Sequence, residues 1–496
     1  MTVVMTTAGQ VRGTEIADGL TSWRGIPYAA PPTGPLRLRP PQPPVAWRGI
    51  RDASQLGAVG IQPEGQAFAE LSAGVAVPVA EDCLYLNVTA PAGAAGRPVL
   101  VWIHGGGYQM GGGTDMAGDG AVFARDHGVV VVTFNYRLGA FGFLALPGEE
   151  PTGACGLHDQ IAALRWVHTN IAAFGGDPGQ VTVYGLSAGA KSAANLLASP
   201  LARGLFQRVA SSSGGADHVA TRAQAAALSR RFFRELGAAP ERIREIPAAG
   251  ILAAQEAVGT GLQATWLWRP AIDGSALTQP PLAAIAAGAA PGVPLLAQSC
   301  AREAAIYQLF APDAADQADR VLAEYFGPAR RDAILAAYAA SRPELAGDPT
   351  ELRLAIMTDE RYGLPTTRLA DAQSGHALVW RSRWDGPFTG LPDPLPAALR
   401  PVAAGMHAAH GSDGSAVWTG GTGLAGQLHE AWGHFVTTGT PAAPSLPGWP
   451  AYRVPDRDTM IFAPSGPYLA ADPRPAERTA WDGLTWESGT WWPFGS

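Results

Sequence analysis

Three short runs of aliphatic and β-branched residues, each leading into a turn with glycine, constrain the fold of this chain most strongly. They cover residues 97–107, 129–139 and 180–189. Runs of this kind are typical of strands that are buried on both faces of a parallel sheet. Between the second and third runs, residues 158–178 carry apolar side chains at helical spacing and end in a Gly-Gly and Pro stop. Strand, helix and strand in this order predict an α/β fold.

No linker of flexible composition divides the sequence into separate domains. Its 496 residues alone favour about three domains. However, the Ala- and Arg-rich segments 217–290 and 305–370 are helical in pattern, and a further apolar run at 292–300 lies between them. Another strand is predicted at 376–384. We therefore predict one domain over residues 1–496, with the two helical segments inserted into a single sheet.

Composition and charge exclude several classes of function. Hydrophobic residues make up 47% of the chain and charged residues 16%, which favours a large buried core over disorder. A net charge of −7 provides no basic surface for nucleic acid. No uncharged apolar run reaches the ~18 residues of a membrane span, and the N-terminal residues do not resemble a signal peptide. We expect a cytoplasmic protein, a monomer or small homo-oligomer, that binds neither nucleic acid nor membrane.

The third apolar run ends in the pattern G-x-S-x-G, formed by Gly185, Leu186, Ser187, Ala188 and Gly189. A strand candidate precedes it and an Ala-rich helix follows, which is the context of a nucleophile elbow. Small residues are needed at both ends because the turn is tight, and the start of the helix offers N–H groups to an anion. The pattern predicts Ser187 as a nucleophile, with an ordinary glycine-rich turn as the alternative.

A glycine run at the end of the first strand candidate supports this prediction. His104 is followed by Gly105, Gly106 and Gly107. Glycines leave backbone N–H groups uncovered, as an oxyanion hole for a developing negative charge requires. A flexible loop would explain the glycines alone, but not their position after a strand and about 80 residues before the G-x-S-x-G pattern.

A nucleophilic serine needs a base, which is expected in the chain order Ser, acid, His. Six histidines follow Ser187, at positions 218, 376, 407, 410, 429 and 434. Four of them are poor candidates. His218 precedes any plausible acid, and His376 opens a predicted strand, whereas a catalytic base is expected after the end of a strand. The other two, at positions 429 and 434, lie on a predicted helix over 424–436. His407 and His410 remain, and we prefer His410 because a glycine follows it in a turn-rich loop.

The acid is expected after a strand that lies between the nucleophile and the base. The run 292–300 is the clearest such strand, and Glu303 follows it closely. Asp273 is the alternative, although in the sequence PAIDGSAL its side chain is more typical of a turn cap.

Lys191 is the only lysine in the chain, and it lies four residues after Ser187. A base role of the kind seen in Ser–Lys enzymes is conceivable at this spacing. However, the position is one turn into the predicted helix and below the elbow, so we expect Lys191 to take no part in catalysis.

Taken in order, these patterns resemble the type-B carboxylesterase family of α/β hydrolases. Further stretches carry the resemblance almost from end to end: GIPYA at 25–29 with Pro31-Pro32, EDCLYLN at 81–87, HGGGY at 104–108, NYR at 135–137, Asp159-Gln160, FGGDP at 174–178 and WPAY at 449–452. The resemblance implies an α/β-hydrolase fold, with a mostly parallel central sheet and helical insertions that cap an active-site gorge.

The family's functional positions can be carried over residue by residue. The implied nucleophile, acid and base are Ser187, Glu303 and His410, and the implied oxyanion hole is formed by the N–H groups of Gly106, Gly107 and Ala188. Ser213 matches a serine that supports the catalytic residues, with a turn residue at a strand end as the alternative. Two buried ion pairs are implied, Arg37 with Glu81 and Arg137 with Asp159. No metal or organic cofactor is implied.

The sequence departs from the family pattern at four places. Leu186 stands where the family usually has glutamate, so cationic substrates should bind less well. The acid loop reads AREA at 301–304, and the histidine loop reads HGSDG at 410–414. Cys83 falls where secreted members have a half-cystine, but no cysteine lies near Gly60, so we expect a free, buried thiol.

We predict a serine carboxylesterase that hydrolyses neutral esters through an acyl-enzyme. A carbamate or aryl-amide hydrolase would use the same residues and is the first alternative. A non-catalytic binding or adhesion homologue is the second, although such homologues lack triad residues that this chain keeps. The helical segments and the loop 62–80 are expected to wall an apolar pocket, through Phe68, Leu71, Trp266, Trp268, Phe310 and Tyr362.

Overall fold

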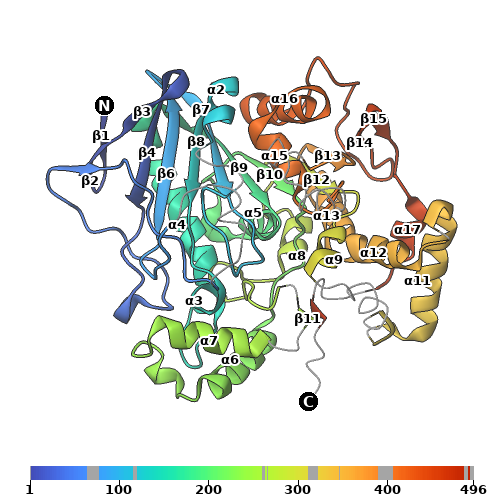
Figure 1. Cartoon of the computed structure of the whole chain (residues 1–496), viewed down its shortest axis with the longest axis horizontal. Coiled ribbons are helices and arrows are strands. Elements are labelled where there is room, and N and C mark those ends of the chain that lie inside the picture. Colours follow the sequence, from blue (N-terminus) through green and yellow to red (C-terminus); the bar gives the residue numbers. More distant parts are fainter. Residues whose placement is uncertain are drawn as a thin grey trace.

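The computed structural model of this chain describes most of its residues. These are residues 2–63, 77–115, 120–259, 263–264, 266–310, 322–324, 326–345, 347–388, 406–484 and 490–491. Within them, a mixed sheet of 11 strands forms the centre of the fold (Figure 1).

The middle of this sheet is parallel and its two ends are antiparallel. The parallel strands lie in the spatial order β8 (Val130–Phe134), β7 (Arg97–Ile103), β9 (Gly176–Leu186), β10 (Arg208–Ser212), β12 (Leu295–Cys300), β13 (Val379–Trp384) and β14 (Thr459–Ala463). Antiparallel strands extend both ends: β15 (Gly466–Ala470) beside β14, and β6 (Tyr85–Pro91), β4 (Leu20–Pro27) and β3 (Thr14–Ile16) beyond β8.

Two small sheets lie outside the central one. The first contains β1 (Val3–Thr6), β2 (Gly9–Arg12) and β5 (Ile50–Asp52), and the second pairs β11 (Gln263–Ala264) with β16 (Thr490–Trp491). The N-terminal region therefore consists of short strands and turns.

The apolar runs form strands because both faces of the sheet are covered. In β7, Val99 and Val101 enter one hydrophobic core, whereas Leu100 and Trp102 enter the other. Alternate side chains of a strand point to opposite faces, so a strand between two cores is apolar throughout. All five predicted strands are confirmed as β7, β8, β9, β12 and β13, whereas β10 and β14 were not predicted.

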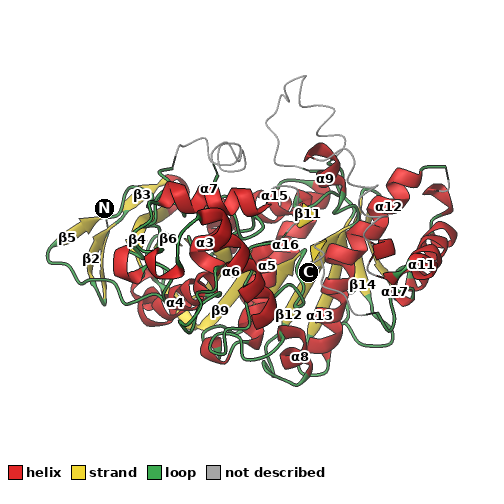
Figure 2. Ribbon diagram, turned by 90° about the horizontal axis from the view of Figure 1, so that it is seen from below, coloured by secondary structure: helices red, strands yellow, loops and turns green. Residues whose placement is uncertain are grey.

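Helices form a layer on each side of the sheet, and in Figure 2 the helices of one layer lie in front of the strands. One layer contains α4 (Cys155–Asn170), α5 (Ala188–Ala198), α8 (Pro281–Ala286) and α13 (Leu364–Ser374), and the other contains α2 (Ala121–His127), α15 (Ser412–Thr419) and α16 (Gly423–Thr438). The predicted helices over 158–178 and 424–436 correspond to α4 and α16, so the three-layered α/β architecture is confirmed.

The two predicted helical segments are also helical in the structure. The first contains α6 (Arg222–Leu236), α7 (Ala248–Gly259) and α8, and the second contains α9 (Ala305–Phe310), α11 (Pro328–Ser341), α12 (Pro349–Thr358), the π-helical turn η7 (Asp359–Gly363) and most of α13. Figure 1 shows α6 and α7 side by side at one end of the molecule and α11 and α12 at the other. Two short helices complete the description, α3 (Gly139–Phe143) and α17 (Pro475–Thr479).

Both implied ion pairs are present. Arg37 donates to the two carboxylate oxygens of Glu81 at 2.7 and 2.6 Å, and Arg137 donates to those of Asp159 at 2.8 and 2.7 Å. Cys83 is a free, buried thiol, as expected. Of the helices described, none has the length and apolar character that a membrane span needs.

Candidate active site

Ser187 occupies a tight turn between β9 and α5. Its backbone has φ 57° and ψ −121°, a conformation that residues other than glycine rarely adopt. The turn is closed by hydrogen bonds on both sides, from the Ser187 N–H to the Ser212 carbonyl at 2.9 Å and from the Lys191 N–H to the Ser187 carbonyl at 2.9 Å. This geometry is that of a nucleophile elbow.

The glycines of the elbow are required by close backbone contacts. A Cβ atom on Gly189 would lie 2.0 Å from the Ile103 carbonyl oxygen, and one on Gly185 would lie 2.2 Å from the Gly189 carbonyl carbon. Any larger residue would therefore push α5 away from β7 and β9. The sequence prediction of a tight strand–turn–helix unit is confirmed.

The glycine run after β7 lies directly against the elbow. A Cβ atom on Gly105 would be 3.3 Å from the Ser187 Cβ atom, and Gly106 and Gly107 both have positive φ, 98° and 62°. Among the described residues, no hydrogen bond uses the N–H groups of Gly106, Gly107 or Ala188, the first residue of α5. Backbone donors beside a serine oxygen are what an oxyanion needs.

Glu303 and His410 form a hydrogen-bonded pair. His410 Nδ1 lies 2.6 Å from Glu303 Oε2, although the two residues are 107 positions apart. The other oxygen, Oε1, accepts hydrogen bonds from Ser213 Oγ at 2.6 Å and from the Cys300 N–H at 2.7 Å. Glu303 is fully buried, so these three donors take the place of water around its carboxylate.

The two alternatives from the sequence lie elsewhere. His407 is exposed. Asp273 is hydrogen-bonded to His158 Nε2 at 2.7 Å and accepts hydrogen bonds from the N–H groups of Ser275 and Leu277. Asp273 is therefore the turn cap that its sequence context suggested. The structure brings His410 to Glu303 and brings neither alternative to either of them.

Two further residues hold the pair in place. Ser213 bonds Glu303, and the ring of Tyr362 lies against the His410 imidazole, with 4.4 Å between ring centroids and 31° between ring planes. The Tyr362 hydroxyl is hydrogen-bonded to that of Tyr307. Sequence reasoning placed Tyr362 in a pocket wall and did not connect it with the base.

Asp413 is a buried carboxyl group that sequence reasoning missed. It accepts hydrogen bonds from Gln298 Nε2 at 2.5 Å and from Cys300 Sγ at 3.4 Å. Burial, with a smaller contribution from Glu303, raises the pKa of Asp413 above the usual range. The sequence signal that could have identified this group was the presence of an acidic residue three positions after His410.

His104 takes a structural position below the glycine run. Its ring stacks on Tyr136, with centroids 4.3 Å apart, and the Tyr136 hydroxyl donates to the His104 carbonyl at 3.0 Å. Burial lowers the pKa of His104 to about 4, so the ring is neutral at physiological pH. A neutral ring adds no charge to the oxyanion region.

The remaining predicted residues are core residues or lie outside the description. Leu186 is buried and belongs to the core on the α15–α16 side of the sheet. Trp266, Trp268 and Tyr362 are buried in the core on the opposite side. Phe68, Leu71 and the side chain of Phe310 lie outside the described residues. No group of metal-ligating side chains occurs in the described part of the chain.

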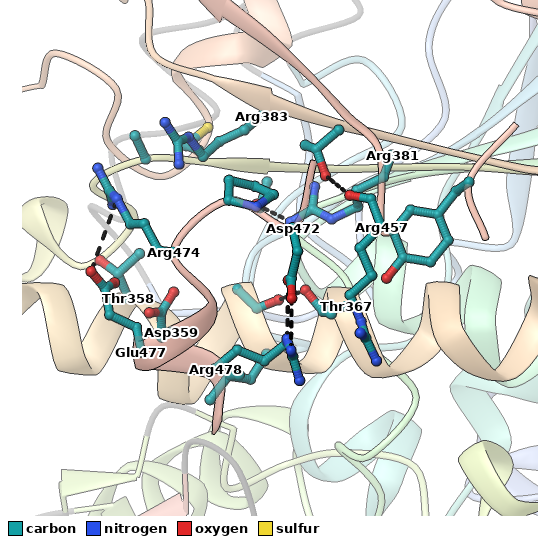
Figure 3. A pocket seen from close by; sticks show the side chains of 18 residues that line it. Thr358, Asp359, Thr367, Arg381, Arg383, Arg457, Asp472, Arg474, Glu477 and Arg478 are labelled. Carbon is teal, nitrogen blue, oxygen red and sulfur yellow. Dashed lines mark hydrogen bonds and ion pairs between the residues drawn. The ribbon is translucent and has the colours of Figure 1, made fainter. Parts of the chain in front are cut away.

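A polar cavity lies beside the site (Figure 3), between β12–β14, the η7–α13 segment and α17. Five guanidinium groups line it, from Arg381, Arg383, Arg457, Arg474 and Arg478. Figure 3 shows Arg478 paired with Asp472, at 2.7 Å, and Arg383 is likewise paired with Asp385, at 2.7 Å. None of the predicted catalytic side chains lines this cavity, and each of these two ion pairs joins residues that are close in the sequence.

The sheet order, the elbow and the glycine run together define an α/β hydrolase with a serine at the nucleophile position. The model of the carboxylesterase family matches residues 1–466, and the chain belongs to this family. It is a carboxylic ester hydrolase.

Full-length relatives and solved structures agree with this assignment. The chain is 36% identical to a para-nitrobenzyl esterase of Bacillus subtilis (strain 168), over 93% of this chain and 94% of the relative. It is 33% identical to a phenmedipham hydrolase of Pseudarthrobacter oxydans, over 95% and 97%. The solved structure of a Geobacillus stearothermophilus carboxylesterase is 35% identical and superposes with a TM-score of 0.81, covering 97% of this chain and 100% of that one.

Proposed function

We propose that this chain hydrolyses small neutral carboxylic esters through an acyl-enzyme on Ser187, with His410 as base and Glu303 as acid. The observation that carries the proposal is the Glu303 carboxylate, which holds His410 by one oxygen and is fixed by two donors on the other. A histidine held in one tautomer and orientation is what a serine nucleophile needs as its base.

In the proposed reaction, the Ser187 oxygen attacks the ester carbonyl while His410 Nε2 takes its proton. The hydrogen bond between His410 Nδ1 and Glu303 fixes the tautomer that leaves Nε2 free to accept. Negative charge develops on the carbonyl oxygen, and the N–H groups of Gly106, Gly107 and Ala188 are the proposed donors to it. The protonated imidazole then delivers its proton to the leaving alcohol, and water repeats the sequence on the acyl-enzyme.

The charges around the site favour neutral over cationic substrates. Leu186 supplies no carboxylate next to the nucleophile. In addition, the Lys191 nitrogen lies 4.3 Å from the ring centre of Trp266 and 4.6 Å from that of Tyr362, so both rings already bind a cation. We expect a lower kcat/KM for acetylcholine than for 3,3-dimethylbutyl acetate, which has the same shape without the charge.

The experiment that tests the proposal compares the parent with Ser187→Ala on p-nitrophenyl butyrate, together with labelling by a fluorophosphonate. We expect turnover to fall by several orders of magnitude and labelling to disappear. Glu303→Gln should lower turnover strongly, whereas Asp273→Asn should leave it unchanged. Full activity in Ser187→Ala, or an unlabelled parent, would refute the proposal and favour a binding homologue.

Carbamates and aryl amides are second candidate substrates, because the same residues can attack a carbonyl flanked by nitrogen. The similarity to a phenmedipham hydrolase over nearly the whole chain supports including phenmedipham in the substrate panel. The panel should also contain acyl esters of graded chain length, which report the size of the acyl pocket.

We propose a cytoplasmic location, and a protein that works as a monomer or small homo-oligomer without nucleic acid or membrane. The three buried, unpaired cysteines support a reducing compartment. Fractionation of the producing cells, with immunodetection of the chain, tests the location, and enrichment outside the cytoplasm would contradict it.

A further inference from the structure

Lys191, the only lysine of the chain, is fully buried beneath the proposed catalytic residues. It belongs to α5, which begins directly after Ser187, and every residue of this helix is buried. Burying an ammonium group is costly unless other groups of the protein replace its water. The burial of Lys191 therefore has to be explained by the groups that surround its nitrogen.

Three contacts surround the Lys191 nitrogen. It donates a hydrogen bond to the Ser213 carbonyl at 3.1 Å, and it lies over the rings of Trp266 and Tyr362. Among the described residues, no carboxylate lies within ion-pair distance of it. The ammonium is thus held by a carbonyl dipole and two aromatic faces.

Two of these three contacts lead directly to the acid–base pair. Ser213, bound to Lys191 through its carbonyl, donates its hydroxyl to Glu303 at 2.6 Å. The Tyr362 ring, whose centre is 4.6 Å from the Lys191 nitrogen, has its centre 4.4 Å from that of the His410 ring. The nitrogen and the imidazole centre are therefore at most 9.0 Å apart.

Charged groups face Lys191 from three segments: Asp217 and His218 after β10, Glu303 after β12, and Glu360 and Arg361 on η7. Burial lowers the pKa of Lys191 to about 7, while the carboxylates oppose this shift. Burial, together with the charge of Lys191, lowers the pKa of His218 to about 4, so His218 is neutral. Lys191 and Arg361 therefore lie near these three carboxylates, and Arg368 also lies near Asp217.

We infer that Lys191 is a positioning residue of the catalytic site: it fixes Ser213 and Tyr362, and through them Glu303 and His410. This role rests on the proposed function, and it differs from that of the base in Ser–Lys enzymes because the nitrogen bonds the Ser213 carbonyl. The expectation that Lys191 takes no part in catalysis followed from its place on the helix. It did not consider the contacts of the side chain with Ser213 and Tyr362.

The kinetic test uses Lys191→Met, which keeps the length of the side chain and removes the charge. We expect kcat to fall about tenfold with KM little changed, because two supports of the pair lose their partner. The acidic midpoint of the kcat/KM profile should also move up by about one pH unit, since a cation close to the acid–base pair has been removed.

Lys191→Arg is the matched variant, because it keeps the charge and changes the shape. Its acidic midpoint should stay at the parent value even where its kcat is lower. A purely structural role would change the thermal stability of both variants but would leave both midpoints at the parent value, and that result would overturn the inference.

A second measurement needs no substitution at position 191. Because the chain has one lysine, labelling with [13Cε]lysine gives a single resonance that reports Lys191. We expect it to titrate near pH 7 in the folded parent, to shift to lower pH in Glu303→Gln, which removes a neighbouring anion, and to stay unchanged in Asp273→Asn. If the titration midpoint of this resonance were the same in Glu303→Gln as in the parent, the inference would be overturned.

The two proposals can fail separately. A parent that is neither active nor labelled by a fluorophosphonate refutes the proposed function, whatever the lysine resonance does. An active, labelled parent whose Lys191→Met variant keeps kcat and the acidic midpoint refutes only the positioning role.

Discussion

Replacing Ser213 with alanine removes one of the three hydrogen bonds that hold the Glu303 carboxylate. The Ser213 hydroxyl donates to Oε1 at 2.6 Å, and both residues are fully buried. The Cys300 N–H and His410 Nδ1 remain as donors after the substitution. Because Ser213 is buried, water does not readily replace the lost hydroxyl.

The size of the effect follows from the charge of the acceptor. A hydrogen bond to a charged group contributes about 1.5–3 kcal/mol, and each 1.4 kcal/mol corresponds to about a tenfold change in rate. We therefore expect kcat/KM of Ser213→Ala to fall roughly 10- to 150-fold, mainly through kcat, since Glu303 acts on His410 and not on bound substrate.

The assay is hydrolysis of p-nitrophenyl butyrate at several pH values, with two control variants. Ser211→Ala makes the same chemical change two residues earlier, where the hydroxyl is 3.5 Å from the Ala190 carbonyl, and should keep parent activity. Ser213→Gly removes the hydroxyl but suits the positive φ of 58° at this position, so it should lose activity with less loss of stability. Parent-like kcat/KM in both Ser213 variants would refute the reasoning.

Three further predictions concern the scaffold. Gly189→Ala should give an inactive protein with a lower melting temperature, because its Cβ would lie 2.0 Å from the Ile103 carbonyl; an active, equally stable variant would contradict the elbow geometry. Asp159→Asn leaves the Arg137 cation buried without its partner, so denaturant titration should show a loss of about 3–5 kcal/mol in unfolding free energy, and no loss would contradict it. Burial lowers the pKa of Lys191 to about 7, against about 10.4 in an unfolded chain, so the unfolded state binds more protons between these values. The parent should therefore gain stability relative to Lys191→Met by about 1.4 kcal/mol per unit as pH rises from 7 to 9, and a difference independent of pH would contradict this.

The sequence predicts the strands that are apolar on both faces and misses the others. Residues 97–103 are apolar after their first two residues because two cores receive their side chains. By contrast, β10 has the sequence RVASS, in which three of five residues are polar, although four of the five are buried. A buried serine looks like a loop residue in sequence, and only its partners in the structure explain it.

The candidates for the acid and the base could be narrowed to a few residues from the sequence, but not to one pair. Two histidines and two acids remained, because spacing along the chain says little about contacts between residues 107 positions apart. The sheet order favours Glu303 over Asp273: β10 and β12 are neighbours, so Ser213 and Glu303 follow adjacent parallel strands and meet at the same edge. Asp273 follows neither strand, and it binds His158 instead.

Lys191 shows where a stronger inference from the sequence was possible. Residues 188–198 read AGAKSAANLLA, in which eight of eleven residues are Ala, Gly or Leu and only one is charged. Such an apolar composition favours a buried helix, and in the structure every residue of α5, Lys191 included, is buried. A buried lysine needs partners inside the protein, and the structure shows them to be the Ser213 carbonyl and the rings of Trp266 and Tyr362. The composition of the helix was therefore a signal for the burial of Lys191, whereas its partners could be identified only from the structure.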